Sequence, residues 1–477
     1  MMVCPPLLRA LLAAAVASLF GGCASYNDQT LNVDRAYASG DVTRAATAAA
    51  ANAKRQDNSA SAVLFHLENG LAQRYQAAFE PSLAAFEQAE ARVDEFDAGA
   101  RLRLGRETGA LLTNQAQLPY TGRDYDRVMM NTYKALNFIA LGNHEAARVE
   151  LNRALQRQRD ALDANARRLE RAREDAAQAR SGQIAGSGGQ RYDVTRAKET
   201  PTVASAMDLA TAGLGTRMRA YAAYVNPFSV FLDGLFFLHT AYDASDLERA
   251  RLSFERVASM SPGDAIHADL ARAEAAGQGE PLPPMTYVIF ETGFAPRRAE
   301  VRFDLPLFHT RGVTYVGAAF PQLTFRDRFV NVVQVEAGDT LHRTELVADM
   351  DAVVAQEFQN EWPAVVTKTL TSTALKALAD YALNKAMEDE SWQAQVAVRL
   401  TTALAAASTV GADLRTWKAL PKQFQYTSFP TPADRTLQLT AGLQNAEVTL
   451  ADGQVNLIFV RSFSPQTSLF IDQFVLP

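Results

Sequence analysis

The sequence predicts an α+β protein in which an all-α, tetratricopeptide-like (TPR-like) helical-repeat domain precedes a C-terminal mixed α+β domain. Residues 31–261 carry apolar side chains three and four positions apart in segments rich in Ala, Leu, Arg and Glu, which is typical of amphipathic helices. Similar units recur within this region, as in repeat proteins. After Gly277 a cluster of prolines marks a boundary, and the strand-like alternation of polar and apolar residues begins.

Composition and charge exclude several classes of function. The chain has 477 residues, of which 48% are hydrophobic and 21% charged, so it is long and apolar enough to bury a core. Its 47 basic and 53 acidic residues give a formal charge of −6. A nucleic-acid partner is not expected, because binding phosphates needs a basic surplus. Six His and two Cys disfavour metal and thiol chemistry, and we expect no small-molecule cofactor.

The first 22 residues predict a lipoprotein signal peptide. Arg9 supplies a positive charge, an almost continuous apolar run extends from Leu7 to Phe20, and two glycines precede Cys23. The run is too short to span a membrane as a stop-transfer helix. Residues 19–23 resemble a bacterial lipobox, although Phe20 stands where the motif usually has an aliphatic residue. Lipidation of Cys23 is therefore expected. The alternative is an ordinary secretory peptide in which the cysteine occurs by chance.

The residues after Cys23 predict where the lipoprotein resides. Ala24 and Ser25 follow it, and the absence of Asp there resembles lipoproteins that are passed on to the outer membrane. We expect a protein anchored in the outer membrane by lipid on Cys23 and facing the periplasm. Residues 220–242 are not a convincing membrane span, because polar residues and a proline interrupt them.

Residues 23–277 are interpreted as the TPR-like helical-repeat domain. Small residues in each unit let paired helices approach, and a large apolar residue fills the space between them. The units are Gly142, Ala147, Leu151 and Ala154; Gly70, Phe79, Ser82, Phe86 and Ala89; Ala250, Phe254, Val257 and Pro262; and a weaker one at Gly40 and Ala45. A generic helical bundle is the alternative.

Two details of this region carry further expectations. In the first helix of the Gly142 unit, Asn131 and Lys134 stand where core residues are usual, which suggests that the repeat groove is filled by the protein's own chain. Residues 151–180 predict one long charged helix, because apolar residues recur on one line only. Residues 181–190, SGQIAGSGGQ, predict a flexible loop.

Residues 281–477 predict the α+β domain, a sheet with inserted helices. Residues 286–291 and 299–303 predict a hairpin, and 314–320 and 329–336 further strands. Asp349 or Asp351 is expected to cap a helix that ends near Glu357. Two more helices are expected at 364–387 and 392–409, followed by strands at 436–440, 447–450, 455–461 and 469–475. Strands at both ends of this region indicate that one sheet brings the ends together.

The sequence lacks the catalytic motifs that we considered, and it therefore predicts a protein that is not an enzyme and has no catalytic or metal-binding residues. His144-Glu145 lacks the second histidine that a zinc peptidase helix needs four residues after the first. Glu390-Ser391 resembles the Glu-Ser pair of lytic transglycosylases, but the accompanying Gly-Leu-Met-Gln segment is absent. No nucleophile elbow is present either.

Two short segments are candidate binding loops. Residues 119–127 contain Tyr120, Arg123 and Tyr125, and residues 413–421 contain Arg415 and Trp417. Exposed tyrosine, tryptophan and arginine dominate binding hot spots. In the alternative interpretation the aromatic side chains anchor the loops to the core and each arginine pairs with an aspartate.

Four segments carry a resemblance to a known family: 113–142 (TNQAQLPYTGRDYDRVMMNTYKALNFIALG), 226–239 (NPFSVFLDGLFFLH), 287–296 (YVIFETGFAP) and 412–421 (ADLRTWKALP). They resemble an uncharacterised family of Gram-negative outer-membrane lipoproteins with helical repeats followed by a mixed domain. The resemblance covers nearly the whole mature chain. It implies a non-enzymatic outer-membrane protein and, through neighbouring genes of some members, a link to lipoprotein activators of peptidoglycan synthases.

The sequence thus supports two hypotheses about function. The first is an outer-membrane-anchored periplasmic scaffold or regulator that binds cell-envelope proteins, such as the peptidoglycan-synthesis machinery. The second is a periplasmic glycan-binding or glycan-active protein that works through the C-terminal α+β domain. An accessory role in export of polysaccharide or protein is not separable from the first hypothesis by sequence.

Overall fold

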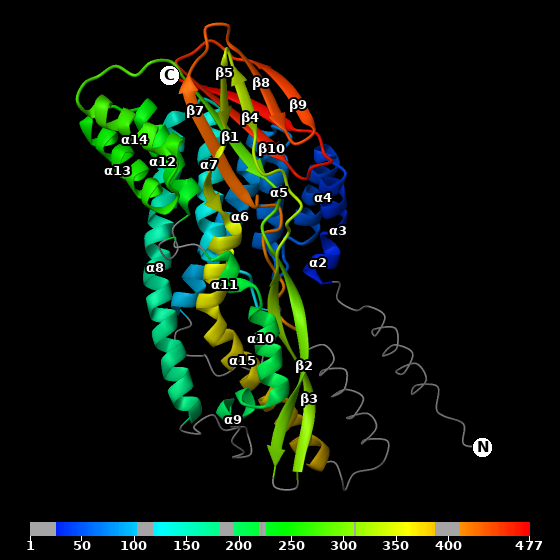
Figure 1. Cartoon of the computed structure of the whole chain (residues 1–477). Coiled ribbons are helices and arrows are strands. Elements are labelled where there is room, and N and C mark those ends of the chain that lie inside the picture. The colour runs from blue at the N-terminus through cyan, green and yellow to red at the C-terminus, as the bar shows by residue number, and fades with distance from the viewer. Residues whose placement is uncertain are drawn as a thin grey trace.

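The computed structural model describes residues 25–102, 118–180, 194–218, 221, 226–309, 312–386 and 411–477. The predicted signal peptide, Cys23, the loop at 181–190 and the helix at 392–409 lie outside these ranges. Helices precede strands along the chain, and the change falls between Gly277 and Met285 (Figure 1). The predicted α+β class and the order of its two parts are confirmed.

The helical part is built from consecutive antiparallel pairs. Helices α3 and α4, α5 and α6, α7 and α8, and α12 and α13 contact each other within each pair. The bounds are α2 (Tyr26–Gln29), α3 (Leu31–Ala38), α4 (Val42–Arg55), α5 (Ala62–Arg74), α6 (Phe79–Leu102), α7 (Asp124–Ala140), α8 (His144–Arg180), α9 (Val194–Lys198), α10 (Pro201–Thr211), α11 (Leu214–Arg217), α12 (Pro227–His239), α13 (Ala244–Met260) and α14 (Asp264–Gly277).

The small residues of the predicted units lie where helices approach each other. Gly70 lies inside α5, and a Cβ there would come within 2.6 Å of the Phe86 ring on α6. Gly234 on α12 faces Phe254 on α13 in the same way, at 3.0 Å. Gly142 has a different role, because its φ of +69° turns the chain between α7 and α8. The chemistry of each unit is therefore close packing of two helices.

The strands form three sheets. The strands are β1 (Met285–Thr292), β2 (Arg297–His309), β3 (Gly312–Thr324), β4 (Gln334–Ala337), β5 (Thr340–Arg343), β6 (Glu345–Asp349), β7 (Gln423–Pro430), β8 (Thr436–Ala441), β9 (Gln444–Thr449), β10 (Val455–Ser462) and β11 (Phe470–Leu476). A five-stranded sheet has the order β11-β10-β1-β7-β6, a four-stranded sheet has the order β5-β4-β8-β9, and β2 pairs with β3 alone.

The five-stranded sheet is buried on both faces. On β1, Tyr287 and Ile289 belong to the core shared with the helices, whereas Val288 and Phe290 belong to the core shared with the four-stranded sheet. Because side chains alternate along a strand, β1 packs against helices on one face and strands on the other. All eight of its residues are buried. The core shared with the helices contains residues from Tyr26 to Leu476, so both parts of the chain contribute to it.

One expected connection is confirmed and another is wrong. Strand β1 pairs in parallel with β10, so one sheet does bring the start and the end of the C-terminal part together. The predicted hairpin of 286–291 with 299–303 does not form. Strand β2 pairs instead with β3, from Arg297 opposite Thr324 to His309 opposite Gly312. The apolar residues of β1 need burial on both faces, and the parallel and antiparallel partners within the large sheet provide it.

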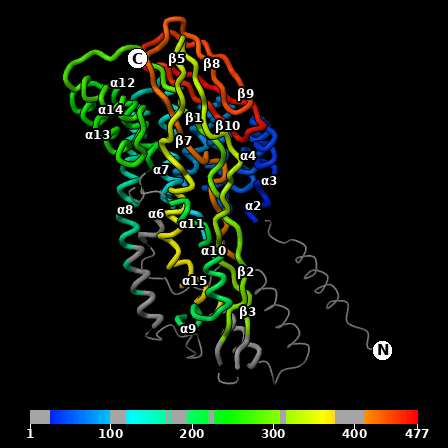
Figure 2. The backbone as a smooth tube through the Cα atoms, in the orientation of Figure 1, coloured from blue at the N-terminus to red at the C-terminus, as the bar shows by residue number. Residues whose placement is uncertain are grey.

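The helix predicted to end near Glu357 also differs from the structure. It continues without interruption as α15 (Met350–Ala386), with Pro363 inside it. Its later half packs with β2, β3, α9 and α10 around a second, smaller core that includes Phe320 and Leu370. Tertiary packing therefore offsets the backbone hydrogen bond that the proline removes. Figure 2 shows α8, α15 and the β2–β3 ribbon running toward the same end of the molecule.

A segment of the C-terminal part fills the inner side of the helical repeats. The Trp417 side chain is fully buried, and its ring lies edge-on to the rings of Phe86 and Tyr133, with centroids 6.0 and 6.1 Å away. The Arg74 guanidinium on α5 also lies over the Tyr133 ring. The predicted filling of the repeat groove by the protein's own chain is confirmed for this segment. No described helix is long and apolar enough to cross a membrane.

Candidate functional site

Three of the five predicted binding residues meet at one place. The Tyr120 ring lies between two guanidinium groups, with Arg415 5.3 Å and Arg123 6.0 Å from its centroid. Arg415 forms an ion pair with Asp413 at 2.8 Å, and Arg123 forms one with Glu361 on α15 at 2.6 Å. All three side chains are buried or nearly so, so they do not form the exposed binding surface that one of the two interpretations requires.

The other two predicted binding residues are also buried. The Tyr125 hydroxyl lies 3.1 Å from the hydroxyl of Thr416, next to Trp417 in the segment that enters the repeats. The aromatic side chains thus anchor the two loops, and the arginines pair with carboxylates, as the alternative interpretation predicted. The reason is that each loop covers the other. A side chain that is exposed on an isolated loop becomes buried when a distant loop packs on it.

Two guanidinium groups keep the carboxylate of this junction charged. Glu361 accepts hydrogen bonds from Arg123 and from Arg298 on β2, the latter at 3.1 Å. Burial raises the pKa of Glu361, but the two guanidinium groups outweigh that effect and hold its pKa below the ordinary value. The junction therefore joins α7, α15 and β2 by charge pairs that are shielded from water.

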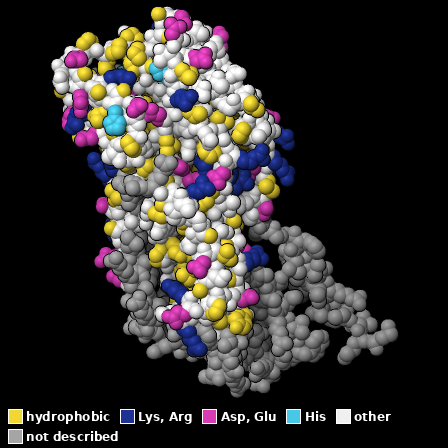
Figure 3. Space-filling model, in the orientation of Figure 1, with side chains coloured by type: hydrophobic (Ala, Val, Ile, Leu, Met, Phe, Trp, Pro, Cys, Tyr) yellow, Lys and Arg dark blue, Asp and Glu magenta, His cyan; other side chains and the backbone are white. Residues whose placement is uncertain are grey.

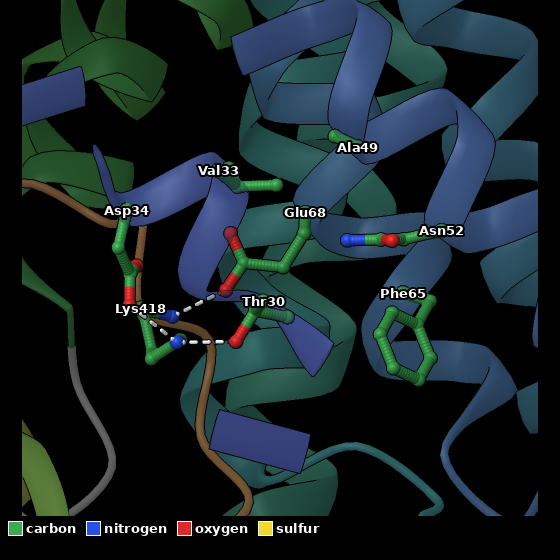
Figure 4. Close-up of a pocket in the computed structure, with 8 residues that line it drawn as sticks. All are labelled: Thr30, Val33, Asp34, Ala49, Asn52, Phe65, Glu68 and Lys418. Carbon is green, nitrogen blue, oxygen red and sulfur yellow. Dashed lines mark hydrogen bonds and ion pairs between the residues drawn. The ribbon is translucent and has the colours of Figure 1, made fainter. Parts of the chain in front are cut away.

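A polar cavity lies where the same C-terminal segment meets the first helices (Figure 4). The Lys418 ammonium reaches Asp34 on α3 at 2.8 Å and also the hydroxyl of Thr30. The Lys418 backbone N–H donates to Glu68 on α5 at 2.7 Å, and the Tyr26 hydroxyl donates to the same carboxylate oxygen at 2.9 Å. The segment is therefore held by hydrogen bonds to α3, to α5 and to Thr30, which lies between α2 and α3.

This cavity is too small for an organic ligand. Its volume is about 10 Å³, which is about the room that one water molecule needs. Burial raises the pKa of Glu68 to about 7, although the Lys418 ammonium opposes the rise. Burial likewise lowers the pKa of Lys418. We interpret the cavity as part of the packing between the C-terminal segment and the first helices. The charges of Glu68 and Lys418 beside it depend on pH.

A larger groove opens between α8 and the α12–α13 pair on the other flank of the molecule. It has a volume of about 500 Å³, within the range of ligand sites in proteins. Helices α8 and α13 form its walls, and α12 contributes to its base. Its lining residues are Leu151, Leu155, Gln158, Arg159, Ser229, Val230, Asp233, Ser245, Glu248, Arg249, Leu252, Ser253 and Arg256. We call it the α8/α13 groove.

The α8/α13 groove combines apolar and cationic side chains. Leu252 is 49% exposed, although it lies on the same helix as the buried Phe254. Arg249 forms an ion pair with Asp233 and also donates to Asn152 at 2.6 Å. Arg159 and Arg256 are exposed, and neither forms an ion pair with any residue that the structure describes. The groove thus presents two unpaired positive charges.

Sequence reasoning missed this groove. Leu252, Arg159 and Arg256 lie at ordinary surface positions of predicted helices, and single exposed apolar residues are common. One sequence feature could have indicated an exposed leucine here: Leu252 is not among the packing residues Ala250, Phe254 and Val257 of its own unit. In the view of Figure 3, basic and acidic side chains are interspersed over the surface, so no large one-sign patch points to a site.

The described residues contain no group of His, Cys, Asp or Glu arranged to hold a metal ion. Comparisons with protein-family models and with curated proteins find no match to this chain.

Proposed function

We propose that the protein is an outer-membrane-anchored periplasmic lipoprotein that acts as a protein-binding scaffold or regulator of cell-envelope machinery, such as peptidoglycan synthesis. The observation that carries the proposal is the α8/α13 groove, which lies between α8 and the α12–α13 pair and has an exposed leucine and two unpaired arginines in its lining. Apolar contacts flanked by arginine are typical of protein interfaces.

The anchor in this proposal derives from the sequence at Cys23. A Cys23→Ser variant is expected to lose lipid labelling and to shift from the membrane fraction to the soluble periplasmic fraction. An unchanged distribution between the two fractions would contradict the lipid anchor, without bearing on the groove.

Photo-crosslinking in living cells tests the groove as a docking surface. A photoreactive residue at position 252, in the groove, is compared with one at position 443, in the β8–β9 turn, where Leu443 is 89% exposed. We expect one identified envelope protein to be captured at position 252 and not at position 443. The same adducts at both positions, or no protein adduct at 252, would contradict the proposal.

Photo-crosslinking at position 252 also tests the glycan hypothesis. It expected an exposed tryptophan in the C-terminal part, and Trp417 is fully buried there, so its ring is not available to stack on a sugar. None of the thirteen described residues that line the α8/α13 groove is aromatic. Glycan adducts at position 252 would nevertheless favour that hypothesis over protein binding.

A further inference from the structure

The chemistry of the α8/α13 groove identifies the kind of partner that it fits. We infer that the groove binds an acidic peptide segment that carries aliphatic side chains beside its carboxylates. This inference rests on the proposed function and names the partner class for the same surface.

The unpaired charges in the groove lining are positive. Both carboxylates in the groove already have cationic partners: Asp233 pairs with Arg249 at 2.5 Å, and Glu248 pairs with Arg251 at 2.7 Å. Arg251 lies outside the groove lining, and it neutralises the negative charge of Glu248. What remains unpaired among the described lining residues is cationic. A ligand that supplies carboxylates would complete these pairs.

The two unpaired arginines lie on different helices of the groove. Arg159 belongs to α8 and Arg256 belongs to α13, so the two charges come from opposite walls of one groove. A single carboxylate on a small molecule would engage one wall. A peptide segment with acidic residues on two sides could engage both, and the volume of about 500 Å³ admits several side chains.

The groove lining also contains aliphatic side chains. Leu155 and Leu252 come from the same two walls, and Val230 comes from α12. Leu252 is about half exposed, so its burial by a ligand would be favourable in proportion to the apolar area removed from water. An anionic glycan would satisfy the arginines but would leave the leucines without an apolar partner. The aliphatic lining therefore favours a peptide.

Two labelled synthetic peptides test the inference by fluorescence anisotropy with the full-length purified protein. The first peptide repeats Glu-Leu-Leu-Glu-Ala three times, and in the second each Glu is replaced by Gln. We expect the Glu peptide to bind more tightly than the Gln peptide, and the difference to shrink as salt screens the charges. Equal binding of both peptides at low salt, or no binding of the Glu peptide, would overturn the inference.

Variants of the groove complete the test. Arg159→Ala and Arg256→Ala are each expected to weaken binding of the Glu peptide by about fivefold, as for one exposed ion pair, and to leave the Gln peptide unaffected. Arg44→Ala is the matched control, because Arg44 is an exposed arginine on α4, outside the groove. An equal loss in the control would show that net charge, and not the groove, attracts the peptide, and this would overturn the inference.

The outcomes separate the inference from the proposed function. If crosslinking at position 252 captures an identified envelope protein but the peptides show no preference for Glu, the scaffold proposal stands and the acidic partner is wrong. If the captured protein is a second copy of this chain, and sedimentation of the Arg159→Ala variant shows the same oligomer as the unaltered protein, the acidic partner is again wrong. A loss of that oligomer would support the role of Arg159.

Discussion

The indole of Trp417 lies edge-on to the ring of Phe86, with ring centroids 6.0 Å apart and planes inclined by 63°. One residue belongs to a loop before β7, and the other belongs to a repeat helix. Phe86 also fills the space that Gly70 leaves on the neighbouring helix. This contact therefore connects the repeat packing to the strand-rich part, and its removal should destabilise both parts.

We expect Trp417→Ala to reduce the free energy of unfolding by about 3–5 kcal/mol, because it leaves a large cavity between α6 and α7. Trp417→Phe should be milder, since a ring remains and the indole N–H has no hydrogen-bond partner among the described residues. Urea unfolding monitored by circular dichroism measures both variants. Leu443→Ala is the control, and its 89% exposed side chain should contribute less than about 0.5 kcal/mol.

Gly70→Ala tests the close approach of α5 and α6. The added methyl group would lie 2.6 Å from the Phe86 ring, which cannot yield without disturbing Trp417. We expect a destabilisation of about 1–3 kcal/mol from overpacking. Gly277→Ala on α14 is the matched control, because a Cβ there meets nothing within 4 Å. If both variants lower the thermal midpoint equally, close packing at Gly70 is not the reason for its glycine.

Arg123→Ala tests the buried junction of α7 with α15. The substitution would leave the largely buried Glu361, whose side chain is 20% exposed, with Arg298 as its remaining cation, and loss of one partner from a buried ion pair typically destabilises by about 3–5 kcal/mol. Arg251→Ala removes a more exposed pair with Glu248 on one helix, which should contribute about 1 kcal/mol or less. Chemical denaturation of both variants under one condition makes the comparison. Similar losses would contradict the assignment of Arg123 to a shielded junction.

The cavity beside Lys418 predicts a pH dependence of stability. Burial raises the pKa of Glu68 to about 7 in the folded protein, above the ordinary value of 4.5. The folded state therefore holds this proton more tightly than the unfolded state does. The stabilisation is complete below about pH 4.5 and is lost as the pH rises to about 7.

Glu68→Gln removes this titration and keeps an oxygen that accepts hydrogen bonds. Between pH 5 and about 7 the unaltered protein should lose stability relative to the Gln variant, by on the order of 1–3 kcal/mol. Urea unfolding at several pH values gives the difference. Glu87→Gln, at an exposed position on α6, is the control and should follow the unaltered protein. A Glu68→Gln curve parallel to that of the unaltered protein would show that Glu68 does not titrate in this range.

The sequence by itself determined the α+β class, the order of its parts and the packing residues of the repeats. These features depend on periodicity, because Ala147, Leu151 and Ala154 recur on one face of a helix whatever lies elsewhere in the chain. Strands at both ends of the C-terminal region also predicted that one sheet brings those ends together, but they did not predict that β1 pairs in parallel with β10.

Only the tertiary structure decided which loop residues are buried and where an open surface remains. The backbone N–H of Lys418 donates to Glu68 across 350 residues of sequence, and no local pattern specifies such a contact. Tyr120 resembles an exposed binding residue until Arg415 of the second loop packs on it, and Trp417 does so until the rings of Phe86 and Tyr133 enclose it. Leu252 resembles any surface leucine until α8 and α13 are seen to leave a groove beside it. Burial is a property of the partners that pack on a residue, and those partners come from distant parts of the chain.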